Sequence, residues 1–255
     1  MSAARWRGSG MVLPIEHHAS PNHGERIGGK PVDMLVLHYT GMISDERALK
    51  WLTDPESAVS SHYFVFEDGR IAKLVEEDRR AWHAGQSFWA GETDINSRSI
   101  GIEVANPGHE FGYRPFPASQ IEAVIALCRD ILARHPIPPE RVLAHSDVAP
   151  LRKEDPGELF PWGDLHKAGV GAWVPPEPLG EGVSLKLGER GKGVTEMKNQ
   201  LRSYGYAVGD WLEFDGVTEA AVRAFQRHFR PARVDGVADE STMKTLDRLA
   251  ALRPK

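Results

Sequence analysis

VDMLVLHY, residues 32–39, is a short apolar run rich in strand-forming residues, and it leads into a histidine. The next segment, residues 44–52, begins with Ser-Asp-Glu-Arg and continues with apolar residues at helical spacing, which predicts a capped helix. Residues 62–67 (HYFVFE) and 70–75 (RIAKLV) flank Asp68-Gly69, a dipeptide that favours a hairpin turn. Together these segments predict a strand, a helix and a β-hairpin, in that order.

The alternation of strands and helices continues beyond the hairpin. Residues 99–105 (SIGIEVA) predict a strand, and residues 117–134 predict a long amphipathic helix that is stopped by Pro136. Residues 141–144 predict a short strand that leads into His145. Because strands alternate with helices and one hairpin is present, the expected fold class is α/β, a mixed β-sheet flanked by helices.

The whole chain divides into four segments. Residues 1–29 are interpreted as an N-terminal extension, and residues 30–169 as the α/β domain. Residues 170–183 are rich in Pro and Gly and lack periodicity, which predicts a linker. Residues 184–255 are expected to form a small all-α domain of three helices, near residues 193–204, 218–229 and 239–252.

The composition is that of an ordinary globular protein, 41% hydrophobic and 26% charged, and 255 residues suit one mid-sized domain with a small appendage. The formal net charge of -5 gives no positive field, so nucleic acid is not expected as a partner. The single cysteine, Cys128, excludes an intrachain disulfide. It lies in a helical apolar pattern, which indicates a buried thiol and not a nucleophile.

The sequence holds no stretch that approaches the roughly 20 apolar residues needed to span a bilayer, so no transmembrane segment is expected. Residues 1–20 lack the continuous apolar run of a signal peptide. Because the sequence begins with Met1, a cytoplasmic location is expected. The periplasm or cell envelope is the alternative, if an export signal has been removed.

Two histidines and an aspartate stand out as candidate metal ligands. His38 and His145 each follow a short apolar strand, and Asp155 comes ten residues after His145 in a charged, turn-prone segment. Two imidazoles and one carboxylate are a common set of ligands for catalytic zinc, which lowers the pKa of water and polarises a carbonyl. Spacing alone leaves a structural role open, because these residues do not form a local HExxH motif.

Glu103 is the candidate general base. It lies within an otherwise apolar strand, where an unpaired carboxylate is costly unless it has a partner or a role. An outward-facing residue of a half-solvated sheet explains the same pattern, so both interpretations stay open. His166 and His228 have no acidic or histidine partner nearby in sequence and are interpreted as solvated or capping side chains.

Five motifs, in one order, resemble the AmpD-like zinc N-acetylmuramoyl-L-alanine amidases, which are related to the phage T7 lysozyme-type amidases and the peptidoglycan recognition proteins. The motifs are VLHYT (36–40), SHY (61–63), AWHAG (81–85), SIGIE (99–103) and HSDVAPLRKEDPG (145–157). They span the region from residue 30 to residue 165. The resemblance implies a zinc-dependent hydrolase that cleaves the amide between N-acetylmuramic acid, or anhydro-muramic acid, and L-alanine in peptidoglycan or muropeptides.

The resemblance also implies roles for individual residues. His38, His145 and Asp155 would bind Zn²⁺, Glu103 would be the general base, and Lys153 would stabilise the oxyanion. The positions that line the family's substrate groove are occupied by Trp82, His83, Asn96 and Arg98. His62, at a recurrent family position, is interpreted as a satisfied structural histidine. The loop at residues 107–117 differs from the family and leaves the length of the substrate open.

The C-terminal domain resembles the three-helix peptidoglycan-binding domain that is often attached to cell-wall hydrolases. Four stretches carry this resemblance: Leu185-x-Leu187-Gly188, Leu201-x-x-x-Gly205-Tyr206, residues 215–226 and residues 234–237. The domain departs from the family at Met197-Lys198, where a Leu-Gln pair is more usual. Three arginines share a predicted helical face and either meet muropeptide carboxylates or are simply solvated: Arg223, Arg227 and Arg230.

Two other functions compete with the amidase. One is a non-catalytic peptidoglycan-binding protein on the same fold, which the presence of the complete ligand set argues against. The other is a different zinc peptidase, such as a carboxypeptidase, whose ligand patterns are not visible in this sequence. The choice between the intact sacculus and soluble anhydro-muropeptides as substrate stays open, as does the oligomeric state.

Overall fold

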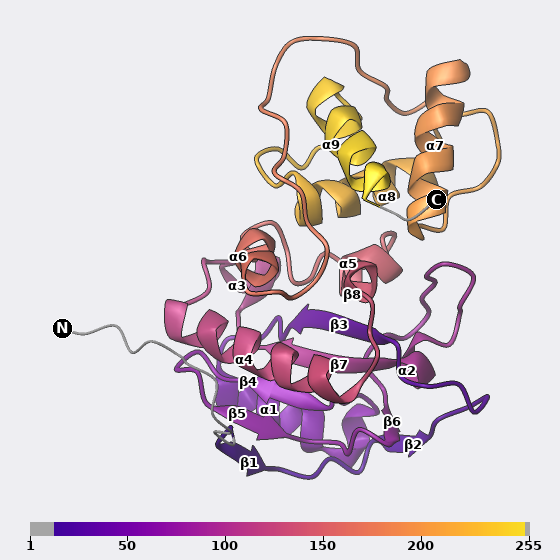
Figure 1. Ribbon diagram of the computed structural model, residues 1–255. Coiled ribbons are helices and arrows are strands. Elements are labelled where there is room, and N and C mark those ends of the chain that lie inside the picture. The colour runs from indigo at the N-terminus through magenta and orange to yellow at the C-terminus, as the bar shows by residue number, and fades with distance from the viewer. Residues whose placement is uncertain (1–12, 253–255) are drawn as a thin grey trace.

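The computed structural model describes residues 13–252 and consists of an α/β part and an all-helical part that are stacked on one another (Figure 1). The main sheet has the strand order β1-β5-β4-β7-β3-β8. Its strands are β1 (Ile15–His17), β3 (Met34–Tyr39), β4 (Tyr63–Val65), β5 (Ile71–Lys73), β7 (Ser99–Val104) and β8 (Val142–Ala144). A separate antiparallel pair joins β2 (His23–Glu25) to β6 (Arg79–Ala81).

Four adjacent strands of the sheet run parallel to one another, in the order β4-β7-β3-β8. β3 pairs with β7 on one side and with β8 on the other, and β4 runs parallel to β7 but antiparallel to β5. All residues of β3 except Tyr39 are buried, as expected for a parallel strand that is covered on both faces. The mixed sheet predicted from the alternation of strands and helices is therefore confirmed.

Helices cover both faces of this sheet (Figure 1). The helical elements of the α/β part are α1 (Asp45–Thr53), a 3₁₀ turn (Pro55–Ser57), α2 (Ile95–Arg98), α3 (Gly108–Phe111), α4 (Ala118–Arg134), a second 3₁₀ turn (Pro139–Arg141), α5 (His145–Val148) and α6 (Trp162–Lys167). α4 packs its apolar stripe against Leu35 and Leu37 of β3. On the opposite face, α1 packs Ala48 and Leu52 against the hydrophobic residues of β4 and β5.

Several local predictions agree closely with the observed elements. Ser44 caps α1, because its side chain accepts a hydrogen bond from the backbone N–H of Arg47. The Asp68-Gly69 turn joins β4 to β5, and Gly69 has a φ of 93°, a left-handed conformation that favours glycine. Cys128 is buried in α4, where burial raises the pKa of its thiol to about 12. A thiol held in its protonated form is a poor nucleophile.

The segment before residue 30 contributes to the fold, in contrast to its interpretation as an extension. Of residues 1–29, residues 13–29 lie within the described part of the chain. β1 adds a parallel strand beside β5, and β2 pairs with β6. Each of these strands has only three residues and no alternating pattern, so the sequence held no local signal for them. Their partners elsewhere in the chain supply the pairing.

The C-terminal domain contains the three predicted helices, α7 (Lys192–Tyr204), α8 (Gly216–Phe229) and α9 (Glu240–Ala251). Asp215 caps α8 and Asp239 caps α9, each through its side chain. Residues 175–184 form no helix or strand. This stretch is nevertheless attached to α9, because the backbone N–H of Glu177 donates to the hydroxyl of Thr245 over 3.0 Å.

Two of the three arginines, Arg227 and Arg230, differ from both interpretations that the sequence allowed, whereas Arg223 is 40% exposed in its side chain and pairs with Glu219 on the same helix. Arg230 is fully buried and pairs with Asp239, and Arg227 is buried and pairs with Glu154 of the α/β part. Neither arginine is solvated or free for a ligand. His228, interpreted as solvated or capping, is also buried. The helical pattern predicted which residues share a face, but not that this face packs against another part of the protein.

The contacts of Lys198 explain why a lysine replaces the second residue of the usual Leu-Gln pair. Its side chain is buried, and its ammonium group donates to the backbone carbonyls of Trp211 over 2.7 Å and Glu213 over 2.9 Å. A lysine at this position therefore stabilises the loop between α7 and α8.

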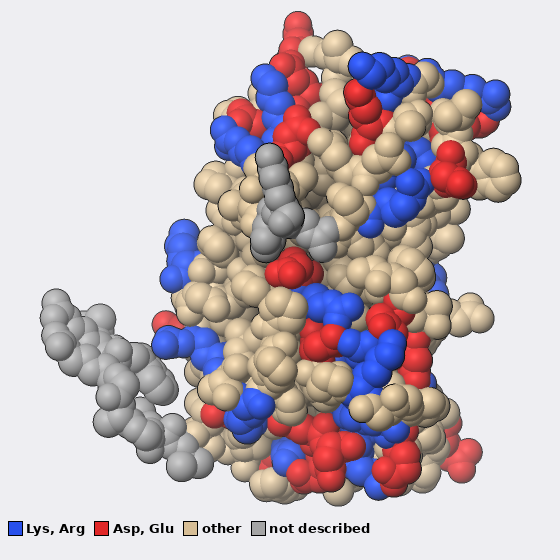
Figure 2. Space-filling model, turned by 45° about the vertical axis from the view of Figure 1, so that its right-hand side comes forward, with Lys and Arg blue, Asp and Glu red and all other residues tan. Residues whose placement is uncertain are grey.

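The surface carries interspersed charges of both signs. Figure 2 shows Lys and Arg side chains alternating with Asp and Glu over the visible face, without a large area of one sign. On this face the mixed distribution is in keeping with the small formal net charge of the sequence. None of the helices within residues 13–252 has the length and apolar character that a bilayer-crossing segment requires.

Candidate metal centre and active site

The candidate site lies at the carboxyl ends of three adjacent parallel strands. His38 is near the end of β3, and Glu103 is its in-register partner on β7. His145 follows β8 directly as the first residue of α5. Parallel strands present their carboxyl ends at one edge of a sheet, which is where ligands bind in open α/β sheets. The sheet topology thus brings together residues that are more than 100 positions apart in sequence.

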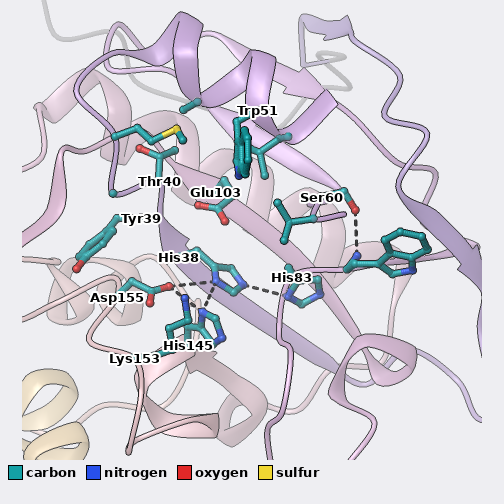
Figure 3. A pocket seen from close by; sticks show the side chains of 16 residues that line it. His38, Tyr39, Thr40, Trp51, Ser60, His83, Glu103, His145, Lys153 and Asp155 are labelled. Carbon is teal, nitrogen blue, oxygen red and sulfur yellow. Dashed lines mark hydrogen bonds and ion pairs between the residues drawn. The ribbon is translucent and has the colours of Figure 1, made fainter. Parts of the chain in front are cut away.

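His38, His145 and Asp155, which we call the ligand cluster, direct three electron-donating atoms at one point (Figure 3). His38 Nδ1 lies 2.9 Å from His145 Nδ1 and 3.1 Å from Asp155 Oδ2, and the His145 Nδ1 to Asp155 Oδ2 distance is 3.0 Å. The three residues are only 1%, 3% and 5% exposed. Two nitrogen atoms bound to one tetrahedral zinc lie about 3.3 Å apart, so the cluster is close to that geometry.

In both imidazole rings, the Nε2 atom, which does not face the ligand cluster, has a hydrogen-bond partner. His145 Nε2 lies 3.1 Å from the carbonyl oxygen of Ala84, which can only accept, so Nε2 carries the proton and Nδ1 presents its lone pair to the cluster. His38 Nε2 contacts His83 Nδ1 at 3.0 Å. The ring of His83 rests on Gly101 of β7, where a Cβ atom would come within 2.5 Å of it. Glycine at position 101 is therefore required for the ring that orients His38.

The electrostatics of the ligand cluster favour a bound cation. Burial, together with the neighbouring His145, lowers the pKa of His38 to about 4, so its ring is neutral at pH 7. Burial alone would raise the pKa of Asp155, but His145 and His38 outweigh it and hold that pKa well below its usual range. Metal binding needs neutral imidazole and ionised carboxylate, which are the states that these shifts favour for His38 and Asp155.

Glu103 lines the same cavity and has a perturbed carboxyl group. Its Oε2 atom is buried and has no hydrogen-bond partner among the residues that the structure describes. Burial raises the pKa of Glu103 well above its ordinary value, the charge of Asp155 adds to this, and Lys153 opposes it. A buried carboxyl group with a raised pKa can take up and return a proton near neutral pH. Figure 3 shows this carboxyl group and the ring of His38 at the same cavity.

The cavity has a volume of about 340 Å³ and two kinds of wall. One wall is polar and consists of the ligand cluster with Glu103 and Lys153. The other is largely apolar and comes from α1 and its flanking loops. The residues of this second wall are Met42, Ala48, Trp51, Leu52 and Val59. Trp51 is 47% exposed, so its indole is available to a bound molecule.

The four predicted substrate-binding residues divide into two pairs. Trp82 and His83 line the cavity, although His83 is buried and contacts His38. Asn96 and Arg98 are not among the lining residues. Asn96 Oδ1 accepts hydrogen bonds from the backbone N–H groups of His83 and Ala84, at 3.1 and 2.8 Å.

Arg98 is buried away from the cavity, where it pairs with Asp33 and Glu92. The structure also places His62 as predicted, because the ring is buried and both of its nitrogen atoms have partners. The apolar wall was not predicted. Its one local signal was the capped helix at residues 44–52, whose sequence does not show which side faces the cavity.

Comparison with known proteins gives independent support. The family model described as N-acetylmuramoyl-L-alanine amidase matches residues 28–158, and a model of a peptidoglycan binding domain matches residues 190–246. The N-acetylmuramoyl-L-alanine amidase AmiD of Escherichia coli is 40% identical over 234 residues, which cover 86% of this chain and 82% of AmiD. The 1,6-anhydro-N-acetylmuramyl-L-alanine amidase AmpD of Enterobacter cloacae is 30% identical and covers 62% of this chain and 91% of AmpD.

Two solved structures resemble the chain over nearly its whole length. The complex of E. coli AmiD with the substrate anhydro-N-acetylmuramic acid-L-Ala-D-γ-Glu-L-Lys has a TM-score of 0.74 at 37% identity and covers 89% of this chain and 91% of AmiD. AmpDh3 of Pseudomonas aeruginosa in complex with anhydromuramic pentapeptide has a TM-score of 0.74 at 33% identity, with 90% and 95% covered. Both folds therefore include the C-terminal helices.

Proposed function

The chain belongs to the N-acetylmuramoyl-L-alanine amidase family, and from that premise we propose that it hydrolyses muropeptides with a zinc ion held by His38, His145 and Asp155. The bond that breaks is the amide between the lactyl group of the muramic acid and the nitrogen of L-alanine. The convergence of three buried donor atoms carries this proposal, together with the Glu103 carboxyl oxygen beside them, which has no hydrogen-bond partner within residues 13–252.

Zinc fits the donor set. Two neutral imidazole nitrogens and one carboxylate leave a fourth tetrahedral position open, which is the arrangement of catalytic zinc sites. Zinc held there would supply Lewis-acid polarisation of the scissile carbonyl and would lower the pKa of the attacking water. His83 and the carbonyl of Ala84 would keep the two rings oriented toward the ion.

The chain's own residues would move the proton and stabilise the charge. Glu103 accepts a proton from the attacking water as the new C–O bond forms at the carbonyl carbon. It then donates this proton to the alanine nitrogen as the C–N bond breaks, which leaves a lactyl carboxylic acid and a free amine. Transfer of the acid's remaining proton to the amine gives the carboxylate and ammonium products. The ammonium group of Lys153, which lines the cavity, stabilises the oxyanion of the tetrahedral intermediate.

The cavity and the comparisons support one substrate class, a peptide joined to muramic acid. A polar wall beside an apolar one suits a peptide stem joined to a muramic acid, with Trp82 and Trp51 as the proposed contacts. The solved AmiD and AmpDh3 complexes contain anhydromuramic peptides, which supports soluble fragments as substrates. The match of the C-terminal region to a peptidoglycan binding domain supports activity on longer wall material as well.

The test offers the zinc-loaded protein intact sacculi and soluble anhydro-muropeptides in parallel. Mass spectrometry then looks for peptides with a free N-terminal alanine. We expect release from the soluble fragments, with His38→Ala and Glu103→Ala as inactive controls. Release from sacculi as well would assign a wall hydrolase. Zinc binding without release from either substrate would overturn the proposal and favour a non-catalytic recognition protein.

A further inference from the structure

The C-terminal domain contacts the segment that carries two of the proposed metal ligands. Asp147 lies two residues after His145 in α5, and its carboxylate is 1% exposed. It accepts a hydrogen bond from the backbone N–H of Ala144 over 2.8 Å, at the start of the helix. It also accepts one from the hydroxyl of Tyr206 over 2.6 Å and one from Nδ1 of His228 over 2.7 Å. Two of its three donors thus belong to the C-terminal domain.

These contacts, which we call the Asp147 cluster (Asp147, Tyr206 and His228), lie in a region that excludes water. Tyr206 and His228 are buried, and the ring of His228 stacks on Trp162 of α6 at a centroid distance of 3.8 Å. α5 has only four residues, and a single helical turn is not stable on its own. Its conformation, and with it the direction of His145, depends on the partners that surround it.

A second contact holds the other end of the same segment. Arg227 of α8 donates to Glu154 over 2.8 Å, and Glu154 stands directly between Lys153 and Asp155. Asp155 is tied back to α5, because its carbonyl accepts from the backbone N–H of Ser146 over 3.0 Å. The C-terminal domain therefore contacts the segment from residue 145 to residue 155 near both of its ends.

A third contact reaches the loop behind His145. The carbonyl of Ala84 orients His145, and Trp89 lies five residues further along the same loop. The indole of Trp89 packs edge-on against Tyr206, with ring centroids 5.0 Å apart. The indole also rests on Gly205, where an added Cβ atom would come within 2.5 Å of it. One continuous hydrophobic cluster joins the C-terminal domain to the face of the sheet that holds the metal centre. Figure 1 shows the two parts stacked on one another at this face.

We propose that the C-terminal domain is a structural part of the catalytic centre, in which Tyr206, His228 and Arg227 act as positioning residues for His145 and Asp155. This inference rests on the proposed function, because it takes these two residues to be metal ligands. The proposed role of the C-terminal domain goes beyond tethering the enzyme to the cell wall. A tether could be attached anywhere, whereas these side chains determine the geometry of the metal centre.

The experiment uses the full chain with single substitutions that remove or keep one hydrogen bond. Tyr206→Phe deletes only the hydroxyl, and His228→Leu removes the Nδ1 donor. His228→Asn is the conservative rescue, because an asparagine amide places an N–H where Nδ1 lies. Thr245→Val is the matched control, because it deletes a buried hydroxyl of the same domain that bonds to the backbone of Glu177 and Ser241 and not to the Asp147 cluster.

Zinc affinity is measured by competition with a chromophoric chelator, and kcat and KM are measured on anhydro-muropeptide at saturating zinc. We expect Tyr206→Phe and His228→Leu to weaken zinc binding by about tenfold and to lower kcat, with KM within about twofold, as for residues that support metal ligands indirectly. His228→Asn should recover most of the affinity. Thr245→Val should bind zinc like the unmodified protein.

Unchanged zinc affinity and kcat in folded Tyr206→Phe and His228→Leu would overturn the inference. An equal loss in Thr245→Val would overturn it too, because the effect would then reflect general stability. If His228→Leu fails to fold, Tyr206→Phe decides alone. Failure of the unmodified protein to bind zinc is a separate result, and it would contradict the proposed function first.

Discussion

Two buried clusters, each containing an aspartate and at least one histidine, share one short segment of this protein and have opposite properties. The segment supplies Asp147 to one cluster, and His145 and Asp155 to the other. In the Asp147 cluster, the carboxylate accepts hydrogen bonds from a backbone N–H, a tyrosine hydroxyl and an imidazole N–H. In the ligand cluster, the carboxylate of Asp155 faces two imidazole nitrogens, at least one of which, on His145, presents a lone pair. In the Asp147 cluster, hydrogen-bond donors satisfy the carboxylate. In the ligand cluster, lone pairs of oxygen and nitrogen face one another, and a bound cation would satisfy them.

The comparison shows that residue type and burial do not identify a metal site. Both aspartates are buried, and each lies beside a histidine. The two clusters differ in the number of N–H and O–H donors that surround the carboxylate. A buried carboxylate is stable when N–H or O–H groups surround it, and it needs a cation when they do not. The Nε2 atom of His145 donates to the carbonyl of Ala84, so in the neutral imidazole the Nδ1 atom faces Asp155 with a lone pair and not with a hydrogen atom.

The largest expected effect comes from His38→Ala, which removes one lone pair from the ligand cluster and leaves the Asp147 cluster intact. We expect loss of stoichiometric zinc and a fall in turnover of about 1000-fold or more, because Lewis-acid catalysis contributes several kcal/mol. Metal analysis by mass spectrometry and turnover of anhydro-muropeptide check this. If the variant retains one zinc per chain, the distinction between the two clusters is wrong.

Glu103→Gln separates proton transfer from metal binding. The amide keeps the size of the side chain but cannot accept a proton, so turnover should fall by about 10²- to 10⁴-fold. Zinc content should equal that of the unmodified protein, because Glu103 is not part of the ligand cluster. Full turnover in this variant would show that another group is the base.

His62 offers a third buried histidine with which to sharpen the comparison. Both of its ring nitrogens have partners, and burial, assisted by Arg26, lowers its pKa to about 3. The unfolded chain takes up a proton at this residue near pH 6.5, but the folded chain does so only near pH 3. Between these values the unfolded state binds more protons, so stability falls as the pH falls.

Substitution of His62 by Gln should remove this contribution. The pH dependence of the unfolding free energy between pH 6 and pH 4 should become flatter by up to about 1.4 kcal/mol per pH unit. Chemical denaturation at several pH values measures the slope. An unchanged slope would mean that other buried groups, such as His38 and His83, account for the acid sensitivity.

The smallest effect is expected at the apolar wall. Trp51→Ala should raise KM for anhydro-muropeptide by about three- to tenfold, which corresponds to roughly 1 kcal/mol of lost contact, and should leave kcat unchanged. Trp211→Ala is the control, because Trp211 is 72% exposed and does not line the cavity. A fall in kcat for Trp51→Ala would show that α1 also affects the polar wall.

Local patterns in the sequence predicted much of the fold. β3, the hairpin with Gly69, α4 and the three C-terminal helices were predicted because each depends on periodicity, caps or turn residues within a few positions. β1 and β2 were not, since three residues carry no pattern and the pairing comes from distant strands. The inward packing of Arg227 and His228 was missed for a related reason, because it depends on another domain.

The sequence by itself determined the chemical inventory of this protein: two histidines after apolar strands, a carboxylate in a turn, a glutamate inside a strand, and the motifs of an amidase family. Covalent order and side-chain chemistry are local properties, so they can be read directly. Only the tertiary structure decided which lone pairs converge, which carboxylates are already satisfied, and that the C-terminal domain supports α5. Those outcomes depend on the register of parallel strands and on packing between segments distant in sequence, which no local pattern encodes.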